Sequence, residues 1–464
     1  MTGPAPDPGS ASRGAQAVAR LLRPRSVAIV GMSARAGSIG QLILQSLKVN
    51  DFAGAIHLVG RSADPIDGRP CLASADDLPE GVDLAVFTLP AAAVGEATAA
   101  CVRRKVGAAL IFAAGFAETG DPSEQERISA MARDGGLAIV GPNCLGYTNN
   151  VDGLMVHMLF ARRAHRYGAG SQSGVAFVGQ SGGLLGHFQR GAEARRMPVS
   201  YVVSTGNEAG LDLADFTEYL VEDQATRVIV LYAEQIRRPG DFLAACERAR
   251  LAAKPVVVMH PGRSARARRA VQTHTGALVG DFGAMRTQVE GAGVLLVEAL
   301  DELMDVSELL VHYPVPPAAG PAVMTASGAY CAIADDFAES LGLDLPRLSA
   351  STQAALKKGM PDFGTVKNPL DITAGNTGSI PALTKALIDD PDTGSLFVSF
   401  PIDGRAGLLR LQNVVKGIEG ATKPVVIAAL GDTSPIEAEI TSIAKERGLI
   451  FSRSSDRCLR AIAR

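Results

Sequence analysis

Short apolar runs of strand length alternate with helix-forming segments along most of this 464-residue chain. In the first third the apolar runs are 27–30, 56–59, 84–89, 108–112 and 137–140. Between them, a turn at 31–40 opens a helix that runs to residue 47, and helical patterns cover 91–105 and 123–133. Strands that are apolar throughout are typical of parallel sheets covered by helices on both faces. The alternation therefore predicts an α/β fold, with a first domain over residues 20–150.

After residues 151–174, which show no regular pattern, the alternation resumes. Apolar runs at 175–178, 199–203, 228–233 and 255–259 predict a second sheet. The Pro-rich segment 313–321 is then expected to be a linker.

A strand, a Ser-Gly turn and a helix recur in the second half of the chain. They occupy 175–184 in one copy and 321–330 in the other, and a proline follows each at a similar distance. The recurrence predicts two flavodoxin-like domains, over 151–313 and 314–464. Residues 1–19, which are rich in Pro, Gly, Ser and Ala, are expected to be disordered.

Charge and cysteine content exclude several classes of protein. The net charge of −3 gives no field that would favour nucleic acid or an anionic membrane, and no apolar run reaches the ~18 residues of a membrane span. The six cysteines are scattered and form neither a Cys-x-x-Cys pair nor a metal-ligand pattern. We therefore expect a cytoplasmic protein with no metal site and with neither nucleic acid nor membrane as a partner.

A Gly- and Ser-rich turn at 31–40 follows the first strand and opens a helix. Such a turn offers backbone N–H groups and a helix dipole to a phosphate. It lacks the Gly-x-Gly-x-x-Gly spacing of a dinucleotide site, and the second strand ends in Gly60-Arg61-Ser62 where an NAD site needs an acidic residue. An arginine suits a phosphorylated ribose, which is a property of both coenzyme A and NADP.

Another turn, Gly141-Pro-Asn-Cys-Leu-Gly146, follows the fifth strand. Ligands bind at the carboxyl ends of strands in open α/β sheets, and the Asn143 amide could receive a thiol or a carbonyl. A purely structural turn explains the sequence equally well. Cys144 is not expected to act as a nucleophile, because no histidine is close to it in sequence.

His274 lies between the arginine-rich stretch 263–269 and a Thr-Gly-Ala turn. A lone histidine is more often an ordinary surface or core residue than a catalytic one. An exposed loop with basic neighbours would nevertheless attract phosphate, and a neutral imidazole attacks phosphorus when a carboxylate orients it. Glu234, at the end of the strand 228–233, is suited to that role.

The run Gln180-Ser181-Gly182-Gly183 begins a helix directly after a strand. It is a second possible anion site of the same kind as the turn at 31–40, and a phosphoryl group on His274 could dock there. A plain strand-to-helix turn is the alternative.

Five segments, 141–146, 178–183, 204–207, 273–278 and Asn368-Pro-Leu-Asp371, follow one another in the order of known family motifs. Over residues 20–460 the chain resembles the ADP-forming (nucleoside-diphosphate-forming) acyl-CoA synthetases, which are related to the α-subunit of succinyl-CoA synthetase. The resemblance implies a CoA-binding Rossmann-like domain followed by two flavodoxin-like domains. It also implies that His274 is phosphorylated, that Glu234 pairs with it, and that phosphate binds at Gln180, Ser181, Gly182 and Gly183.

For coenzyme A, the resemblance implies contacts at Gly31, Met32, Ser33, Val59, Arg61, Pro90, Gly115, Glu118, Asn143 and Cys144. The sequence departs from the family at 60–62, where Gly60-Arg61-Ser62 stands in place of the usual Asn-Pro-Lys.

The activity implied is the conversion of a carboxylic acid, ATP and CoA to acyl-CoA, ADP and phosphate through an acyl phosphate. The chain has no P-loop and ends at Arg464, where fused family members continue into an ATP-grasp domain. We therefore expect a separate ATP-grasp β-subunit to bind ATP/ADP and Mg²⁺, in a hetero-oligomer, with a homodimer as the other possibility. A non-catalytic module that senses CoA or acyl-CoA and an NADP-dependent dehydrogenase are the alternatives. The sequence does not indicate the acid, or whether GTP replaces ATP.

Overall fold

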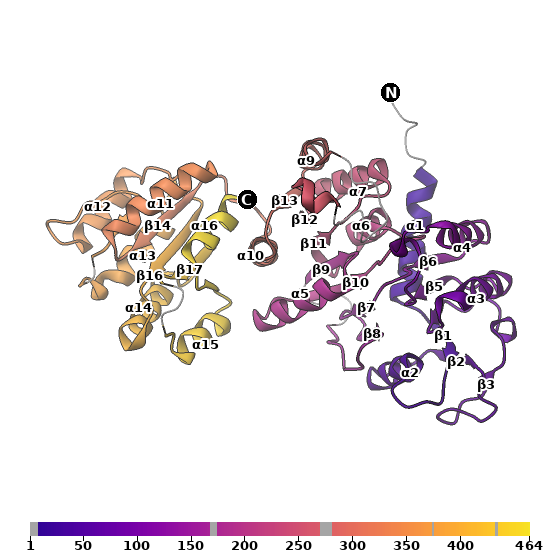
Figure 1. The fold of residues 1–464 in the computed structure, drawn as a ribbon. Helices are drawn as coiled ribbons and strands as arrows, with labels where there is room; N and C mark the ends of the chain where they lie inside the picture. The colour runs from indigo at the N-terminus through magenta and orange to yellow at the C-terminus, as the bar shows by residue number, and fades with distance from the viewer. Residues whose placement is uncertain (1–7, 168–173, 270–280, 374, 432–434) are drawn as a thin grey trace. The chain divides into compact units, whose positions relative to one another are not determined.

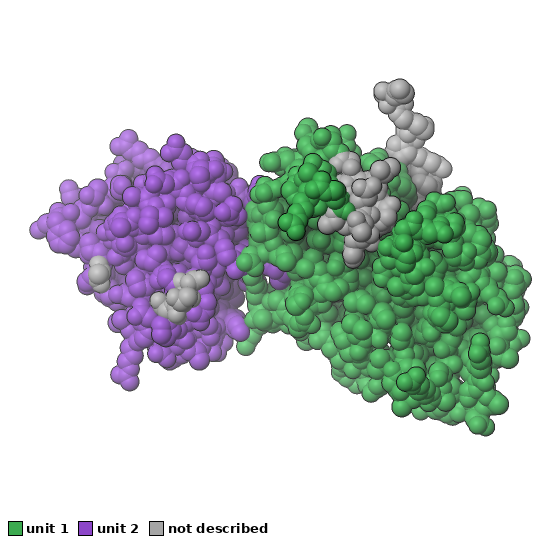
Figure 2. Space-filling model, viewed as in Figure 1, with its two compact units in different colours: residues 1–303 green, residues 304–464 purple. Residues whose placement is uncertain are grey.

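The computed structural model describes residues 8–167, 174–269, 281–373, 375–431 and 435–464, which form three mainly parallel sheets (Figure 1). The chain divides into two compact units, residues 1–303 and 304–464, coloured green and purple in Figure 2. The first unit contains two of the sheets and the second unit contains the third. The α/β class predicted from the alternating pattern is confirmed. Within the described ranges, no helix has the length and apolar character of a membrane span.

The first sheet has the order β3-β2-β1-β4-β5-β6, with every described pair parallel. Its strands are β1 Ser26–Met32, β2 Ala55–Gly60, β3 Cys71–Leu72, β4 Leu84–Phe87, β5 Ala108–Ile111 and β6 Ala138–Val140. The helices between them are α2 Ile39–Val49, α3 Ala91–Arg103 and α4 Ser123–Asp134, with short 3₁₀ turns at Ala75–Asp77 and Ala117–Thr119. This is the Rossmann order, and it reverses direction between β1 and β4, where such folds bind ligands.

The second sheet has the order β13-β12-β11-β9-β10-β7-β8. Its strands are β7 Gly146–Asn149, β8 Leu154–His157, β9 Gly174–Gly179, β10 Val199–Ser204, β11 Thr226–Tyr232, β12 Val256–Met259 and β13 Leu295–Val297. The helices are α5 Gly182–Ala194, α6 Leu213–Glu222, α7 Pro239–Leu251, α9 Phe282–Gly291 and α10 Leu300–His312. Strand β8 lies in a stretch that was expected to be irregular. The prediction missed it because β8 and β7 form an antiparallel hairpin at the edge of an otherwise parallel sheet.

The third sheet has the order β15-β14-β16-β17-β18. Its strands are β14 Pro321–Thr325, β15 Leu370–Asp371, β16 Ser395–Phe400, β17 Val425–Ala429 and β18 Ile450–Ser452. The helices are α11 Gly328–Leu341, α12 Ala350–Gly359, α13 Ile380–Ile388, α14 Gly404–Gly417, α15 Ala438–Glu446 and α16 Ser455–Ala463, with a 3₁₀ turn at Thr377–Ser379. Counted along the chain, this order is 2-1-3-4-5, and β9 to β13 repeat it, so the second and third sheets share the flavodoxin arrangement.

The expected disorder of residues 1–19 is wrong from Pro8 onward, because α1 spans Pro8–Leu22. Val18, Leu21 and Leu22 are fully buried in the core of the first unit. The helix approaches α6 so closely at Gly14 that a β-carbon there would lie 2.1 Å from Asp215 Oδ1. Tertiary packing of an apolar face, rather than local composition, therefore stabilises this helix.

Candidate active site

The residues expected to contact CoA lie at the carboxyl edge of the first sheet. Gly31, Met32 and Ser33 end β1, Val59 and Arg61 end β2, and Pro90, Gly115 and Asn143 follow β4, β5 and β6. Because all the strands are parallel, these positions share one edge of the sheet, on both sides of the reversal between β1 and β4. Arg61 is exposed there.

The turn after β1 needs a glycine. Gly31 has φ +99°, and a β-carbon there would lie 2.9 Å from the backbone carbon of Thr88. Ser33 holds the turn, since its Oγ accepts from the Arg35 N–H at 3.2 Å and its carbonyl accepts from Gln41 Nε2 at 3.1 Å. Pro90, the N-cap of α3, supplies no capping side chain, so side-chain capping does not occupy that helix end.

Asn207, which was not an expected CoA residue, belongs to one hydrogen-bond network with three that were, Gly115, Glu118 and Asn143. The Gly115 N–H donates to Glu118 Oε1 at 2.6 Å, Asn207 Nδ2 donates to Glu118 Oε2 at 2.5 Å, and Asn143 Nδ2 donates to Asn207 Oδ1 at 3.2 Å. Partial burial acts to raise the pKa of Glu118, but the hydrogen bonds from Gly115 and Asn207 outweigh it and lower that pKa. Asn207 follows β10, so the network connects the first and second sheets.

The side chain of Cys144 points into the core. It is 1% exposed, and its Sγ lies 3.3 Å from the Ile111 carbonyl, to which it donates. Burial raises the pKa of its thiol to about 12, so it is protonated at neutral pH. In this structure Cys144 can offer a ligand only its backbone, so the expected contact with CoA is not available to its side chain.

The amino terminus of α5 is open at the site expected for phosphate. The N-cap Ser181 makes no capping hydrogen bond with its side chain. Among the residues that the structure describes, a β-carbon at Gly183 would meet nothing within 4 Å, whereas one at Gly182 would lie 2.4 Å from Leu145 Cγ. Gly182 is therefore required for packing, and Gly183 leaves space beside the first N–H groups of the helix.

The corresponding helix of the third sheet, α11, is closed at the same point. Ser327 Oγ accepts from the Tyr330 N–H at 3.3 Å and caps the helix. Asp371 Oδ2 lies 3.1 Å from where a β-carbon on Gly328 would be. A hydroxyl and a carboxylate of the chain itself thus stand at the amino terminus of α11.

Gln180 joins the beginning of α5 to the residues after β11. Its Oε1 accepts from the N–H groups of Glu234 at 2.6 Å and Gln235 at 2.9 Å, and its Nε2 donates to the Gln235 carbonyl at 2.7 Å. Glu234 itself is 7% exposed. The side chain of Gln180, expected to bind phosphate, is committed to positioning Glu234.

Glu208 was not selected from the sequence, although it directly follows the 204–207 motif. Its Oε1 accepts from Thr205 Oγ1 at 2.8 Å, and Arg237 Nε lies 3.8 Å from its Oε2. That Oε2 has no hydrogen-bond partner within the described part of the chain. Burial and the charge of Asp212 raise the pKa of Glu208 to about 8.

Arg238 fixes the other end of the segment that begins at Glu234. Its Nη2 lies 2.6 Å from Asp212 Oδ1 and 2.5 Å from Asp215 Oδ2 at the start of α6. Hydrogen bonds to Asp212 raise the pKa of Arg238 despite partial burial. The segment 234–238 is therefore attached at both ends, to α5 through Gln180 and to α6 through Arg238.

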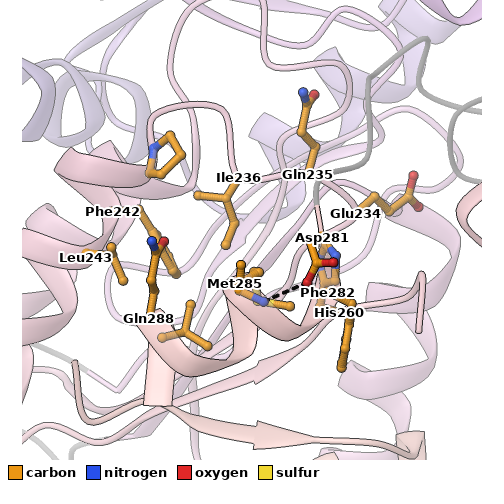
Figure 3. A pocket seen from close by; sticks show the side chains of 13 residues that line it. Glu234, Gln235, Ile236, Phe242, Leu243, His260, Asp281, Phe282, Met285 and Gln288 are labelled. Carbon is orange, nitrogen blue, oxygen red and sulfur yellow. Dashed lines mark hydrogen bonds between the residues drawn. The ribbon is translucent and has the colours of Figure 1, made fainter. Parts of the chain in front are cut away.

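A cavity of about 270 Å³ begins at Glu234 and extends between α7 and α9 (Figure 3). His260, at the end of β12, lines it, and its Nδ1 lies 2.6 Å from the Ala233 carbonyl. Burial lowers the pKa of His260 more than this hydrogen bond raises it. No pattern in the sequence predicts this cavity, because its walls come from two helices and two strand ends.

His274 lies outside the described residues, as does the rest of 270–280. Its pairing with Glu234 thus stays a prediction. Among the residues that are described, no group of three or more His, Cys, Asp and Glu side chains could hold a metal ion.

Two family models match the chain, "CoA binding domain" over residues 25–150 and "Succinyl-CoA ligase like flavodoxin domain" over 172–310. A trans-feruloyl-CoA synthase from an unknown prokaryotic organism is 36% identical over 97% of this chain and 64% of its own length. An ADP-forming acetate–CoA ligase of Archaeoglobus fulgidus is 34% identical over 76% of this chain and 50% of its own length. The chain thus spans between half and two thirds of these relatives.

The alpha subunit of an ADP-forming acetate–CoA ligase from Pyrococcus furiosus is 28% identical over 96% of both chains. Among solved structures, an acetyl-coenzyme A synthetase from Ca. Korarchaeum cryptofilum, in complex with phosphate and ADP, superposes with a TM-score of 0.85 at 26% identity, covering 96% of this chain and 95% of that one.

Fold, site and comparisons together define an α/β protein with a CoA-binding Rossmann-like sheet and succinyl-CoA ligase-like flavodoxin sheets. The chain belongs to the ADP-forming acyl-CoA synthetase family, related to the succinyl-CoA synthetase α-subunit, as its motifs predicted.

Proposed function

We propose that this chain is the CoA-binding, phosphohistidine-carrying part of an ADP-forming acyl-CoA synthetase. The observation that carries the proposal is the hydrogen bonding of Gln180, which joins the open amino terminus of α5 to Glu234. A phosphate seat and a carboxylate able to orient an imidazole are thereby held on adjacent strands, β9 and β11. His274 lies in the segment 273–278, one of the five that follow the order of the family motifs, and is therefore proposed as the nucleophile.

In the proposed mechanism, His274 receives the γ-phosphoryl group of ATP, and Glu234 stabilises the positive charge that develops on the ring. A substrate carboxylate oxygen then attacks phosphorus, and the nitrogen–phosphorus bond breaks. This step forms an acyl phosphate and releases His274 in its neutral form. The N–H groups at the start of α5 stabilise the charge on the phosphoryl oxygens during this transfer.

Coenzyme A, the second substrate, supplies the thiol that attacks the acyl carbon, so that the carbon–oxygen bond to phosphate breaks and the thiol proton passes to solvent or phosphate. Gly31 to Ser33, Val59, Arg61, Pro90, Gly115, Glu118 and Asn143 would hold it. The close passage of Gly31 beside Thr88 and the uncapped start of α3 suit a backbone-lined phosphate site.

ATP/ADP and Mg²⁺ are assigned to an ATP-grasp component. The match to an alpha subunit along 96% of its length supports a separate β-subunit and a hetero-oligomer. The relatives named for acetate and for feruloyl-CoA leave the acid open between small and aromatic carboxylates.

Intact-protein mass spectrometry tests the proposal. The chain is incubated with inorganic phosphate and one of several acyl-CoA thioesters, beside His274→Ala and Glu234→Gln. We expect an acid-labile phosphoryl adduct on the wild type, none on His274→Ala, and formation slowed on the order of 100-fold in Glu234→Gln. CoA binding without an adduct from any thioester, also in the presence of an ATP-grasp subunit, would support the non-catalytic sensing module instead.

A further inference from the structure

The cavity that begins at Glu234 has an apolar interior and a polar end (Figure 3). Glu234, His260 and Asp281 lie at one end, and the deeper walls come from α7 and α9. The larger apolar lining residues are Ile236, Phe242, Leu243, Phe282, Met285 and Val289, and Pro239 and Ala284 complete the apolar lining. At about 270 Å³ it is slightly smaller than the ~300–1,000 Å³ of sites for drug-sized ligands.

The charges of the lining decide which part of an acid could enter. Among the described residues around the cavity, two are carboxylates, Glu234 and Asp281, and none is a lysine or arginine. A substrate carboxylate inside would be buried without a cationic partner, which is costly. An acid would therefore enter with its apolar end first and keep its carboxylate outside the cavity, toward the start of α5, to which Gln180 joins the Glu234 and Gln235 backbone.

Part of the wall beside Glu234 is aromatic. The rings of His260 and Phe282 stack with centroids 6.0 Å apart and planes 29° apart. A carbonyl oxygen can only accept, so His260 Nδ1 carries the proton that bonds to Ala233, and the ring is neutral when Nε2 is unprotonated. Such a wall favours the aromatic ring of an acid over its anionic carboxylate, because the faces of aromatic rings carry partial negative charge. Gln288, away from Glu234 in the view of Figure 3, offers an amide to a polar ring substituent.

We propose that this cavity binds the ring of an aromatic carboxylic acid and that its lining makes the synthetase prefer aryl acids to acetate. The assignment deepens the function proposed above and rests on it for the position of the reacting carboxylate. Acetate would leave the apolar walls in contact with water, whereas an aromatic ring removes them from it.

Calorimetric titration of the free acids tests the cavity without requiring turnover. We expect trans-cinnamate to bind the wild type at least about tenfold more tightly than acetate. Met285→Trp, which fills the cavity, should abolish cinnamate binding. Leu251→Trp, on the same helix as Phe242 but 72% exposed and outside the cavity, is the matched control and should leave binding unchanged.

A second variant covers the case in which Met285→Trp does not fold. Gln288 is exposed, so Gln288→Leu should fold, and it should weaken binding of 4-hydroxycinnamate several-fold while leaving cinnamate unaffected. Equal binding of cinnamate and acetate, or cinnamate binding that persists in a folded Met285→Trp, would overturn the assignment.

Measuring the phosphoryl adduct as well as binding distinguishes a failure of the aromatic-pocket proposal from a failure of the proposed function. If cinnamate binds in a Met285-dependent manner and cinnamoyl-CoA with phosphate phosphorylates His274, both proposals are supported. If cinnamate binds in that manner but no thioester gives an adduct, the proposed function fails and the pocket stands. If acetyl-CoA alone gives the adduct and aromatic acids do not bind, the function stands and the aromatic pocket is refuted.

Discussion

Gln180 Oε1 accepts a hydrogen bond from the Glu234 N–H at 2.6 Å, so a side chain two residues before α5 holds the backbone that carries the Glu234 carboxylate. The same oxygen also accepts from Gln235 at 2.9 Å. One side chain therefore couples the phosphate seat to the residue proposed to orient His274. A disturbance of either strand end should affect both parts of the site.

Gln180→Ala should reduce both stability and phosphorylation. It leaves the Glu234 and Gln235 N–H groups without this acceptor, and an unsatisfied buried donor costs about 1–3 kcal/mol. Urea unfolding and the rate of adduct formation are the measurements. Gln353→Ala, which removes a 2.7 Å bond to the Leu348 carbonyl in the other unit, is the control and should not slow phosphorylation. Wild-type values for Gln180→Ala in both assays would contradict the coupling.

Gly182→Ala and Gly183→Ala should affect different properties, the first stability and the second phosphate binding. A β-carbon at Gly182 overlaps Leu145, so that variant should lose about 1–3 kcal/mol of stability. A β-carbon at Gly183 meets nothing, so Gly183→Ala should keep the wild-type unfolding midpoint but bind phosphate more weakly, because the methyl group intrudes on the seat. Thermal unfolding and phosphate titration test the pair, and unchanged phosphate affinity in Gly183→Ala would argue against the seat.

Glu208 should make stability decrease with rising pH. Its pKa is about 8 in the folded chain and near 4.5 when unfolded, so between these values the folded state retains a proton that the unfolded state has released. Its contribution is complete below about pH 4.5 and lost as pH rises through about 8, with a slope of at most about 1.4 kcal/mol per pH unit. Urea unfolding between these pH values should show a steeper decline for wild type than for Glu208→Gln, and parallel profiles would contradict this assignment.

Cys144 should resist alkylation in the folded protein. With the pKa of its thiol raised to about 12 and its side chain 1% exposed, little thiolate is present or reachable at pH 8. Peptide mapping after iodoacetamide treatment should find Cys71, which is partly exposed, labelled first. The affinity of Cys144→Ser for CoA, measured by calorimetry, should be within about twofold of the wild-type value. A larger loss of affinity would indicate that the Cys144 side chain does contribute to CoA binding.

The sequence predicted those features that depend on strands and the turns directly after them. Gly31, Pro90, Gly115 and Asn143 could be placed on one edge because the carboxyl ends of parallel strands coincide. Glu234 was found for the same reason, since it directly follows a buried strand.

Features that depend on side chains meeting across elements could not be predicted. The cavity combines α7, α9 and the ends of two strands, and Asn207 reaches Glu118 over 89 residues of sequence. Gln180 was assigned to phosphate because the pattern shows where a glutamine lies, not what its amide contacts. Helix α1 was missed because its stability comes from packing on α6, which local composition does not report.

The carboxylate of Asp371 places a negative charge of the chain itself beside Gly328, at the amino terminus of α11. The second and third sheets share one strand order, but at α5 the helix end is left for a visiting anion, whereas at α11 the chain has supplied a negative charge of its own. The repeated architecture therefore contains one helix start that its own N-cap side chain leaves unbonded and one that the chain caps with a hydroxyl and flanks with a carboxylate. An anion that approached α11 would meet the negative charge of Asp371, so of the two related helix starts only that of α5 is suited to bind phosphate.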